Sequence, residues 1–344
     1  MVRAGTVPAR RFPLSLEANM LLGIEIGGTK LQLGVGARSG PPLVTLVRRN
    51  VRIEDGAQGI LAQIREAARP LVTAHRIERI GVGFGGPLAP GGRRTVKSHQ
   101  VAGWDDFPLA DWCEQELGVP TVLGNDADLA GLAEAHFGAG RGRDPIFYIT
   151  VGTGIGGGFI LSGRVYRGTG HGAAEIGHLR PGPAAASSTE TLESRAAGPG
   201  IVATARRLMA DAAVTDLEDL NQRTGGDLEL LTAKTIGEAA AAGNRLALDA
   251  LGESRRVLGW AIAQMITLLS PAAVVIGGGV SLLGEELFFT PLRGTVEQFV
   301  FPPFRSTYQI LPAVLGEEMV VYGAIALAGD DAAESNIRTA NTLL

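Results

Sequence analysis

Two distant stretches of the chain share one pattern of apolar and polar positions. Residues 21–35 and 146–161 each run as an apolar strand, a glycine turn that carries a threonine, and a second apolar strand. The turns are Gly27-Gly28-Thr29-Lys30 in the first stretch and Gly152-Thr153-Gly154 in the second. Because glycine lets backbone N–H groups approach an anion closely, the pair predicts a phosphate-bearing ligand held between two related lobes.

Apolar periodicity predicts further strands and helices. Apolar side chains fall on one face of residues 60–71, which is typical of an amphipathic helix. Short apolar runs that end in glycine or proline predict buried strands, and longer interrupted runs predict helices. The expected strands are 80–84, 119–123, 272–276 and one that starts near Val44, and the expected helices are 109–117, 127–137, 244–269 and 317–328.

This alternation predicts an α/β protein with two lobes. We expect a small lobe over residues 20–125, rejoined by the helix 317–328, and a large lobe over residues 126–316. Residues 168–200, rich in Gly, Pro, Ala and Ser, are expected to be irregular. The segments 1–19 and 329–344 are expected to be tails, with Met20 as an alternative native start.

Composition excludes several classes of protein. Of the 344 residues, 45% are hydrophobic and 19% are charged, which is typical of a globular chain. The net charge of −4 argues against a nucleic-acid-binding surface. No apolar run is long enough for a membrane span, and residues 1–19 lack the apolar core of a signal peptide, so we expect a cytoplasmic protein. The single cysteine, Cys113, excludes an intrachain disulfide and is expected to be a buried structural thiol.

The second turn also matches the spacing of a dinucleotide fingerprint, Gly152-x-Gly154-x-x-Gly157. That fingerprint requires a helix directly after the glycines, whereas the chain continues as a β-rich segment with a turn at Ser162-Gly163. We therefore reject a Rossmann site. The P-loop order of Gly-Lys-Ser/Thr is absent as well. Two ordinary tight hairpins are the simpler explanation of either turn taken alone.

Polar residues stand at three further places where strands or turns end. Asn125 and Asp126 follow a strand and open a helix, which fits an N-cap and also a base that deprotonates a hydroxyl during phosphoryl transfer. Glu175 and His178 lie three residues apart beside the glycine-rich segment, as a structural pair or as ligands for hydroxyl groups. Glu193 is a weaker candidate of the same kind. Gly277-Gly278-Gly279 ends a buried strand, either as a plain turn or as backbone packed against a flat ligand.

These motifs, in this order, resemble the ROK family of sugar kinases and repressors, which has the two-lobed actin-like ATPase fold with a cleft between the lobes. The resemblance spans about residues 21–328, and bacterial glucokinases of the family are the most similar in motif. The motifs are Ile24-Glu-Ile-Gly-Gly-Thr-Lys30, Gly83-Phe-Gly-Gly-Pro87, Gly124-Asn-Asp-Ala-Asp128, Val151-Gly-Thr-Gly-Ile-Gly-Gly-Gly158, Glu175-Ile-Gly-His178 and Val275-Ile-Gly-Gly-Gly279.

The resemblance implies a role for each candidate residue. Asp126 would be the catalytic base in transfer of the γ-phosphoryl group of ATP to the 6-hydroxyl of a hexose, glucose first. The sugar would be bound by Gly86, Asn125, Glu175, His178 and Glu193. ATP would be bound by Gly27, Gly28, Thr29, Lys30, Gly152, Thr153, Gly154, Gly278 and Gly279, with Mg²⁺ accompanying it. Family members are commonly dimers, so the resemblance also implies a homodimer.

Two departures from the family pattern affect metals. The first motif usually carries Asp where this chain has Glu25, which we expect in the outer shell of the Mg²⁺ ion. The usual zinc site of the family follows the histidine with a run of cysteines. This chain has none after His178, so we expect no structural zinc.

Two alternatives to a glucokinase stay open, and a third is disfavoured. The same framework serves N-acetylglucosamine, N-acetylmannosamine and fructose kinases, and pocket shape decides among them. A member that binds sugar without turnover is the second alternative, supported by Glu25 and the missing cysteines. A repressor is disfavoured, because only 23 residues precede Ile24, too few for a helix-turn-helix domain.

Overall fold

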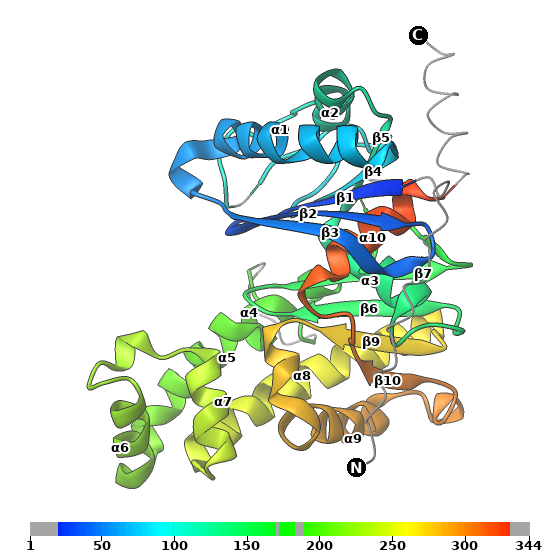
Figure 1. Ribbon diagram of the computed structural model, residues 1–344. Coiled ribbons are helices and arrows are strands. Elements are labelled where there is room, and N and C mark those ends of the chain that lie inside the picture. Colours follow the sequence, from blue (N-terminus) through cyan, green and yellow to red (C-terminus); the bar gives the residue numbers. More distant parts are fainter. Residues whose placement is uncertain (1–19, 99, 170–171, 183–186, 188, 331–344) are drawn as a thin grey trace, which may run out of the picture.

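The computed structural model describes residues 20–98, 100–169, 172–182, 187 and 189–330 (Figure 1). The expected tail 1–19, and 331–344 of the expected tail 329–344, lie outside the described residues. Two five-stranded sheets alternate with three layers of helices (Figure 1). The prediction of an α/β fold with two lobes around a cleft is therefore confirmed.

The first sheet has the strand order β3-β2-β1-β4-β5. β1, β2 and β3 are antiparallel neighbours, whereas β4 and β5 continue the sheet parallel to β1. The strands are β1 (Met20–Ile26), β2 (Lys30–Ala37), β3 (Gly40–Asn50), β4 (Ile77–Phe84) and β5 (Thr121–Asn125).

The second sheet repeats this plan with the order β10-β9-β6-β7-β8. β6 pairs with β7 in a hairpin on one side and with the parallel strand β9 on the other. The two glycine turns thus close equivalent hairpins in the two sheets. The strands are β6 (Ile146–Val151), β7 (Ile155–Leu161), β8 (Arg164–Val165), β9 (Ala273–Gly277) and β10 (Gln309–Pro312).

The α-helices cover both outer faces and fill the space between the sheets (Figure 1). α1 and α2 cover the outer face of the first sheet, and α3 and α10 lie between the sheets (Figure 1). α8 and α9 lie on the outer side of the second sheet, and α5 to α7 extend beyond its edge (Figure 1). The helices are α1 (Gly56–His75), α2 (Leu109–Leu117), α3 (Asp126–Phe137), α4 (Leu192–Ala196), α5 (Gly198–Leu208), α6 (Val214–Arg223), α7 (Ala233–Ala241), α8 (Arg245–Leu269), α9 (Thr290–Phe299) and α10 (Met319–Ala328).

One expectation about the chain's regular structure was wrong. Residues 168–200 were expected to be irregular, but α4 and the start of α5 lie within them. Thr191 caps α4, because its hydroxyl accepts from the Ser194 N–H while the Ser194 hydroxyl accepts from the Thr191 N–H. This reciprocal cap allows a helix of only five residues, and a proline in the first turn then helps to start α5.

Strand alternation lets β6 serve two cores at once. Its side chains at Phe147, Ile149 and Val151 pack with α8, whereas Ile146 and Tyr148 pack with α3 and α10. This follows from the period of two in a strand, which sends successive side chains to opposite faces. A separate core lies between the first sheet, α1 and α2, and it contains the fully buried Cys113. The expected buried thiol is thereby confirmed.

Glycines bring α10 close to its neighbours on both sides. A Cβ at Gly81 of β4 would lie 1.9 Å from the Ala324 carbonyl oxygen of α10. A Cβ at Gly323 of α10 would lie 1.9 Å from the Leu129 carbonyl oxygen of α3. The backbones are therefore in direct contact, and α10 joins the first sheet to α3. Among the described residues, no helix is long and apolar enough to cross a membrane.

Candidate active site

The first glycine turn closes the β1–β2 hairpin tightly. The Gly27 N–H donates to the Lys30 carbonyl over 3.0 Å. A Cβ at Gly28 would lie 1.4 Å from Gln100 Oε1, so a larger residue there would require the exposed Gln100 side chain to move. Thr29 is exposed at the tip of the turn. The expected phosphate ligands Gly27 to Lys30 thus form one compact turn with a free outer surface at Thr29.

The second glycine turn is equally tight and is fixed to the helical layer. The Gly152 N–H donates to the Gly154 carbonyl over 2.9 Å, and the Gly152 carbonyl accepts from the Gly198 N–H at the start of α5 over 2.8 Å. Thr153 is exposed at its tip. The turn therefore presents the same kind of surface as the first one.

The glycines after β9 adjoin this second turn. Gly278 has a φ of +87°, and a Cβ there would lie 2.5 Å from the Val151 carbonyl oxygen. A Cβ at Gly152 would lie 3.9 Å from the Gly279 backbone nitrogen. Gly279 itself faces open space. The structure thus brings Gly152, Gly278 and Gly279 together, and their role in binding ATP stays a prediction.

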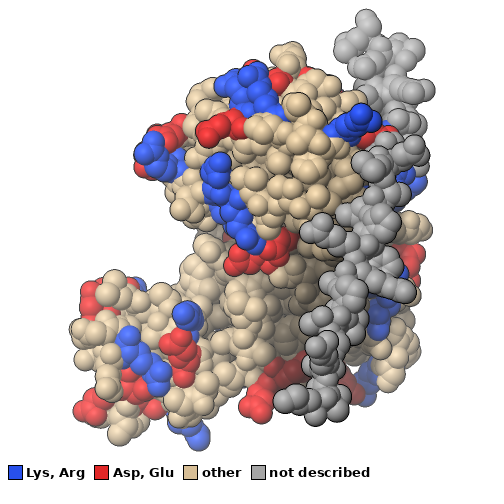
Figure 2. Space-filling model, viewed as in Figure 1, with Lys and Arg blue, Asp and Glu red and all other residues tan. Residues whose placement is uncertain are grey.

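Both glycine turns lie on one hollowed side of the molecule. The β1–β2 and β6–β7 turns are at the left in Figure 1, near α4. At the same place Figure 2 shows a hollow between the lobe that carries the first sheet and the helices α5 to α7. A ligand in this hollow would meet both turns.

Asn125 and Asp126 lie where β5 passes into α3. The Asn125 side chain caps the helix, because its Oδ1 accepts from the N–H groups of Ala127 (2.9 Å) and Asp128 (3.4 Å). Its Nδ2 donates to the Gly86 carbonyl over 3.2 Å. This second bond ties the end of β5 to the turn after β4, so the cap is also a rigid link between two candidate residues.

The Asp126 carboxylate is half-buried beside the same turn. Its Oδ1 accepts from the Ala127 N–H over 2.8 Å, and its Oδ2 lies 3.4 Å from the position of a Cβ on Gly85. Burial raises the pKa of Asp126 to about 6, the Ala127 N–H opposes the rise, and the negative charges of Glu25 and Glu175 add to it. A carboxylate with a pKa close to neutrality is suited to accept a proton.

Glu25 has protein partners on both of its carboxylate oxygens. Oε2 accepts from Gln32 Nε2 over 2.7 Å, and Oε1 lies 3.3 Å from Lys30 Nζ. Gln32 stands directly opposite Glu25 in the β1–β2 ladder. Burial raises the pKa of Glu25, and the Lys30 ammonium opposes that rise. A role for Glu25 in an outer metal shell stays a prediction.

The Glu175 and His178 pair spans one short 3₁₀ turn at Ile176–His178, directly after Glu175. Both side chains are exposed. Glu175 lines the same cavity as Asn125, whereas His178 is not among the residues that line it. The structure thus brings Glu175 close to the Asn125 and Asp126 region, and it leaves the contribution of His178 a prediction.

Glu193 supports the second glycine turn directly. It lies in the first turn of α4, and its Oε2 accepts from the Ile155 N–H over 2.7 Å. A Cβ at Gly154 would lie 2.6 Å from the same oxygen. One function of Glu193 is therefore to hold the turn in shape, and sugar binding by Glu193 stays a prediction.

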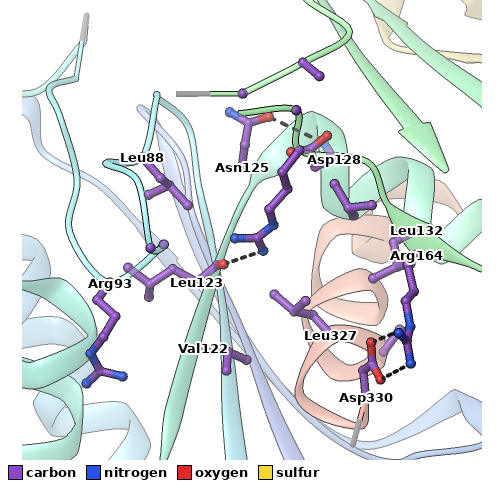
Figure 3. A pocket seen from close by; sticks show the side chains of 18 of the residues that line it. Leu88, Arg93, Val122, Leu123, Asn125, Asp128, Leu132, Arg164, Leu327 and Asp330 are labelled. Atoms are coloured by element: carbon purple, nitrogen blue, oxygen red, sulfur yellow. Dashed lines mark hydrogen bonds and ion pairs between the residues drawn. The ribbon is translucent and has the colours of Figure 1, made fainter. Parts of the chain in front are cut away.

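A cavity of about 940 Å³ extends from Asn125 along α3, between β5 and β8 (Figure 3). Asn125 and Asp128 lie at one end of it, and the ion pair of Arg164 with Asp330 lies at the other (Figure 3). Apolar side chains cover much of the wall between these ends, including Leu88, Val122, Leu123, Leu132 and Leu327.

Three residues of this region were not among the sequence candidates. Asp128 and Arg167 line the cavity. Glu134 is fully buried in α3 and accepts from the backbone N–H groups of Val314, Leu315 and Ala139. The sequence signals for Asp128 are its place in the motif Gly124-Asn-Asp-Ala-Asp128 and its spacing of three from Asn125, which puts both residues on one helix face.

The described parts of the chain contain no cluster of three or more His, Cys, Asp or Glu side chains that could hold a metal ion. Mg²⁺ is often bound by one or two carboxylates together with the phosphates of a substrate. Asp126 and Glu25 are carboxylates close enough to influence each other, but both Glu25 oxygens already have protein partners.

Comparisons with known proteins identify relatives over nearly the whole chain. The model of the ROK family matches residues 21–331. A glucokinase of Thermotoga maritima is 32% identical over 311 residues, which are 89% of this chain and 96% of that protein. An N-acetylmannosamine kinase of Citrobacter koseri is 32% identical over 267 residues, which are 76% of this chain and 83% of that protein.

A solved structure supports the same relationship. The ROK family glucokinase of Streptomyces griseus, crystallised in complex with glucose and AMPPNP, is 32% identical and superimposes with a TM-score of 0.76. The match covers 90% of this chain and 99% of that one.

Proposed function

The chain belongs to the ROK family, and on that premise we propose that it transfers the γ-phosphoryl group of ATP to the 6-hydroxyl of a hexose, with glucose as the preferred acceptor. The observation that carries the proposal is Asp126, a half-buried carboxylate beside a rigid cap at the N-terminus of α3. The glucokinases of Thermotoga maritima and Streptomyces griseus support glucose as the acceptor.

Asp126 is the proposed catalytic base. Phosphoryl transfer to a hydroxyl needs a carboxylate that orients the hydroxyl and accepts its proton. With a pKa of about 6, most Asp126 carboxylates are ionised at pH 7 and can still take up a proton in the transition state. The N-terminus of α3 also favours a negative charge at this place.

The acceptor sugar is proposed to lie beside Asn125, with its 6-hydroxyl at Asp126. The Nδ2 of Asn125 is already bonded to Gly86, so the two residues act as one unit toward the sugar. Glu175, His178 and Glu193 complete the proposed set of sugar ligands.

The two glycine turns are proposed to bind the phosphates of ATP through their backbone N–H groups. Gly278 and Gly279 lie against the second turn, where the adenosine would continue. When bound with ATP, Mg²⁺ would neutralise phosphate charge. Because both Glu25 oxygens have protein partners, we place Glu25 outside the direct ligands of that ion.

A second candidate is an N-acetylhexosamine kinase. The 32% identity to the Citrobacter koseri N-acetylmannosamine kinase favours it, and both activities would use the same base. Discrimination between such substrates depends on the pocket around the sugar rather than on Asp126.

A coupled assay of ADP release tests the proposal over glucose, mannose, fructose, N-acetylglucosamine and N-acetylmannosamine. We expect the highest kcat/KM for glucose, and a loss of about 10²- to 10⁴-fold in kcat for Asp126→Asn. The matched control is Asp211→Asn, an exposed residue of the helical layer, which should keep wild-type activity. Equal turnover by Asp126→Asn would refute the mechanism, and a clear preference for an N-acetyl sugar would replace glucose by the second candidate.

A further inference from the structure

Asp128 faces the cavity from the same side of α3 as Asn125. The two residues are three positions apart, and such residues share a face of a helix, whereas Asp126 projects elsewhere. Accordingly Asn125 and Asp128 both line the cavity, and Asp126 does not. Figure 3 shows Asn125 and Asp128 together at one end of it. A ligand held by Asn125 that extends into the cavity therefore meets Asp128.

The Asp128 carboxylate lacks a partner on one oxygen. Oδ1 is buried and has no hydrogen-bond partner among the described residues. It lies 3.3 Å from the position of a Cβ on Gly158 in β7, so the strand seals this oxygen from solvent. Because Asp128 lines the cavity, Oδ2 is the oxygen that a ligand in the cavity would be expected to meet. A carboxylate so poorly satisfied gains more than an exposed one from a ligand that donates a hydrogen bond.

Arg167 crosses the cavity next to Asp128. Its Nη2 donates to the Leu123 carbonyl over 3.1 Å, and its Nη1 lies 2.7 Å from the position of a Cβ on Gly92. Leu123 is two residues before Asn125 on β5. Arg167 itself follows β8, so its side chain connects the edges of the two sheets at the place where the proposed sugar residues lie.

Charges of both signs surround Asp128. Burial is the largest effect and raises the pKa of Asp128 to about 7, the Arg167 guanidinium opposes the rise, and the negative charges of Glu175 and Asp126 add to it. A neutral donor such as a sugar hydroxyl would stabilise this carboxylate without adding charge. An acidic ligand would be repelled by the three carboxylates.

We propose that Asp128 is a specificity-determining residue that accepts a hydrogen bond from a hydroxyl of the acceptor sugar other than the 6-hydroxyl, with Arg167 as a positioning residue for β5 and Asp128. This inference rests on the proposed function, since it assumes that the sugar lies beside Asn125. It assigns the acceptor class as a neutral hexose with a free hydroxyl at the place that Asp128 reaches.

Size alone cannot select the acceptor here. The cavity of about 940 Å³ is at the upper end of the range for drug-sized ligands and is larger than one hexose needs. A hydrogen bond to the Asp128 carboxyl group supplies a means of discrimination that size does not. A site that forms a hydrogen bond with a hydroxyl discriminates strongly against an analogue that lacks this hydroxyl.

The test is a cycle of ligand and protein changes, measured by isothermal titration calorimetry so that no turnover is needed. Glucose is compared with its 1-, 2-, 3- and 4-deoxy analogues on the wild type, Asp128→Ala, Asp128→Asn and Arg167→Gln. Asp211→Asn and Arg141→Gln, both exposed, are the matched controls. Thermal unfolding verifies that each variant is folded, and the near-isosteric Asp128→Asn keeps the test valid if the alanine variant is not.

We expect the wild type to bind one analogue about 10- to 100-fold more weakly than glucose. Asp128→Ala should bind glucose as weakly as the wild type binds that analogue, and it should show no further loss for the analogue itself. The affinity of Asp128→Asn for glucose should lie between that of the wild type and that of Asp128→Ala. Arg167→Gln should weaken the binding of glucose, but the ratio of the affinities for glucose and for the analogue should stay as in the wild type. With MgATP present, Asp128→Ala should raise KM for glucose more than it lowers kcat.

Two results would overturn the proposal. The first is an Asp128→Ala protein whose affinities for glucose and for each analogue stand in the same ratios as in the wild type. If the alanine variant does not fold, the same result for Asp128→Asn overturns the proposal. The second is a wild type that binds no hexose, which overturns the proposed function too. A wild type that binds glucose without phosphorylating it refutes only the proposed function, and the binding ratios then still decide the role of Asp128.

Discussion

Replacing Asp126 by asparagine should stabilise the protein while it removes activity, and the gain should depend on pH. The substitution keeps the size of the side chain and removes its charge. The acceptor bond from the Ala127 N–H, 2.8 Å long, can be kept by the amide oxygen of asparagine. What changes is the cost of holding an ionised carboxylate in a buried place beside Glu25 and Glu175.

The size of the effect follows from the pKa of Asp126. Folding raises this pKa from 3.8 to about 6, which corresponds to about 3 kcal/mol at 1.36 kcal/mol per unit. Because the folded pKa is the higher one, the carboxyl favours the native state fully below pH 3.8, and that contribution is lost as pH rises to 6. Above pH 6 the wild type carries the whole cost of ionisation, which the asparagine variant avoids.

Urea unfolding of both proteins from pH 4 to pH 8 measures this difference. We expect nearly equal free energies of unfolding at pH 4 and an advantage of up to about 3 kcal/mol for Asp126→Asn at pH 8. The kcat/KM of the wild type should fall as pH is lowered through 6. The exposed Asp211→Asn should show neither effect. A difference in stability that is the same at pH 4 and pH 8, or that favours the wild type throughout, would refute the reasoning.

The other predictions concern structural support. Glu134→Ala should lower the free energy of unfolding by about 3 kcal/mol or more, because it leaves three backbone N–H groups without their acceptor, and denaturant unfolding against the exposed Glu297→Ala measures this. Gly278→Ala should cost about 2 kcal/mol or more, since φ is +87° and the new Cβ would lie 2.5 Å from a backbone oxygen. Gly279→Ala meets open space, so its Tm should match the wild type while KM for ATP rises, and an unchanged KM would argue against the proposed nucleotide position. Metal analysis of the purified protein should find less than stoichiometric zinc, and one zinc per chain would contradict the expectation drawn from the missing cysteines.

The sequence by itself determined the elements whose causes are local. Alternation and apolar runs predicted the two hairpins around glycine turns, and both occupy equivalent central places in their sheets. The polar pair after an apolar run predicted that Asn125 and Asp126 open a helix, and Asn125 is its cap. Residues that are neighbours in sequence decide such features, because a strand period, a turn and a helix cap each involve only a few consecutive residues.

Only the tertiary structure decided how these elements support one another. Glu193 accepts a hydrogen bond from the Ile155 N–H, 38 residues away in the sequence, and Arg167 donates one to the Leu123 carbonyl, 44 residues away. Glu134 accepts a hydrogen bond from the Val314 N–H, 180 residues away in the sequence. A carboxylate or guanidinium carries no local signal of which distant backbone group it will meet, since that contact exists only after the sheets and helices have packed. The cavity beside Asp128 and the raised pKa of Asp126 have the same origin, because both come from burial between elements far apart in the chain.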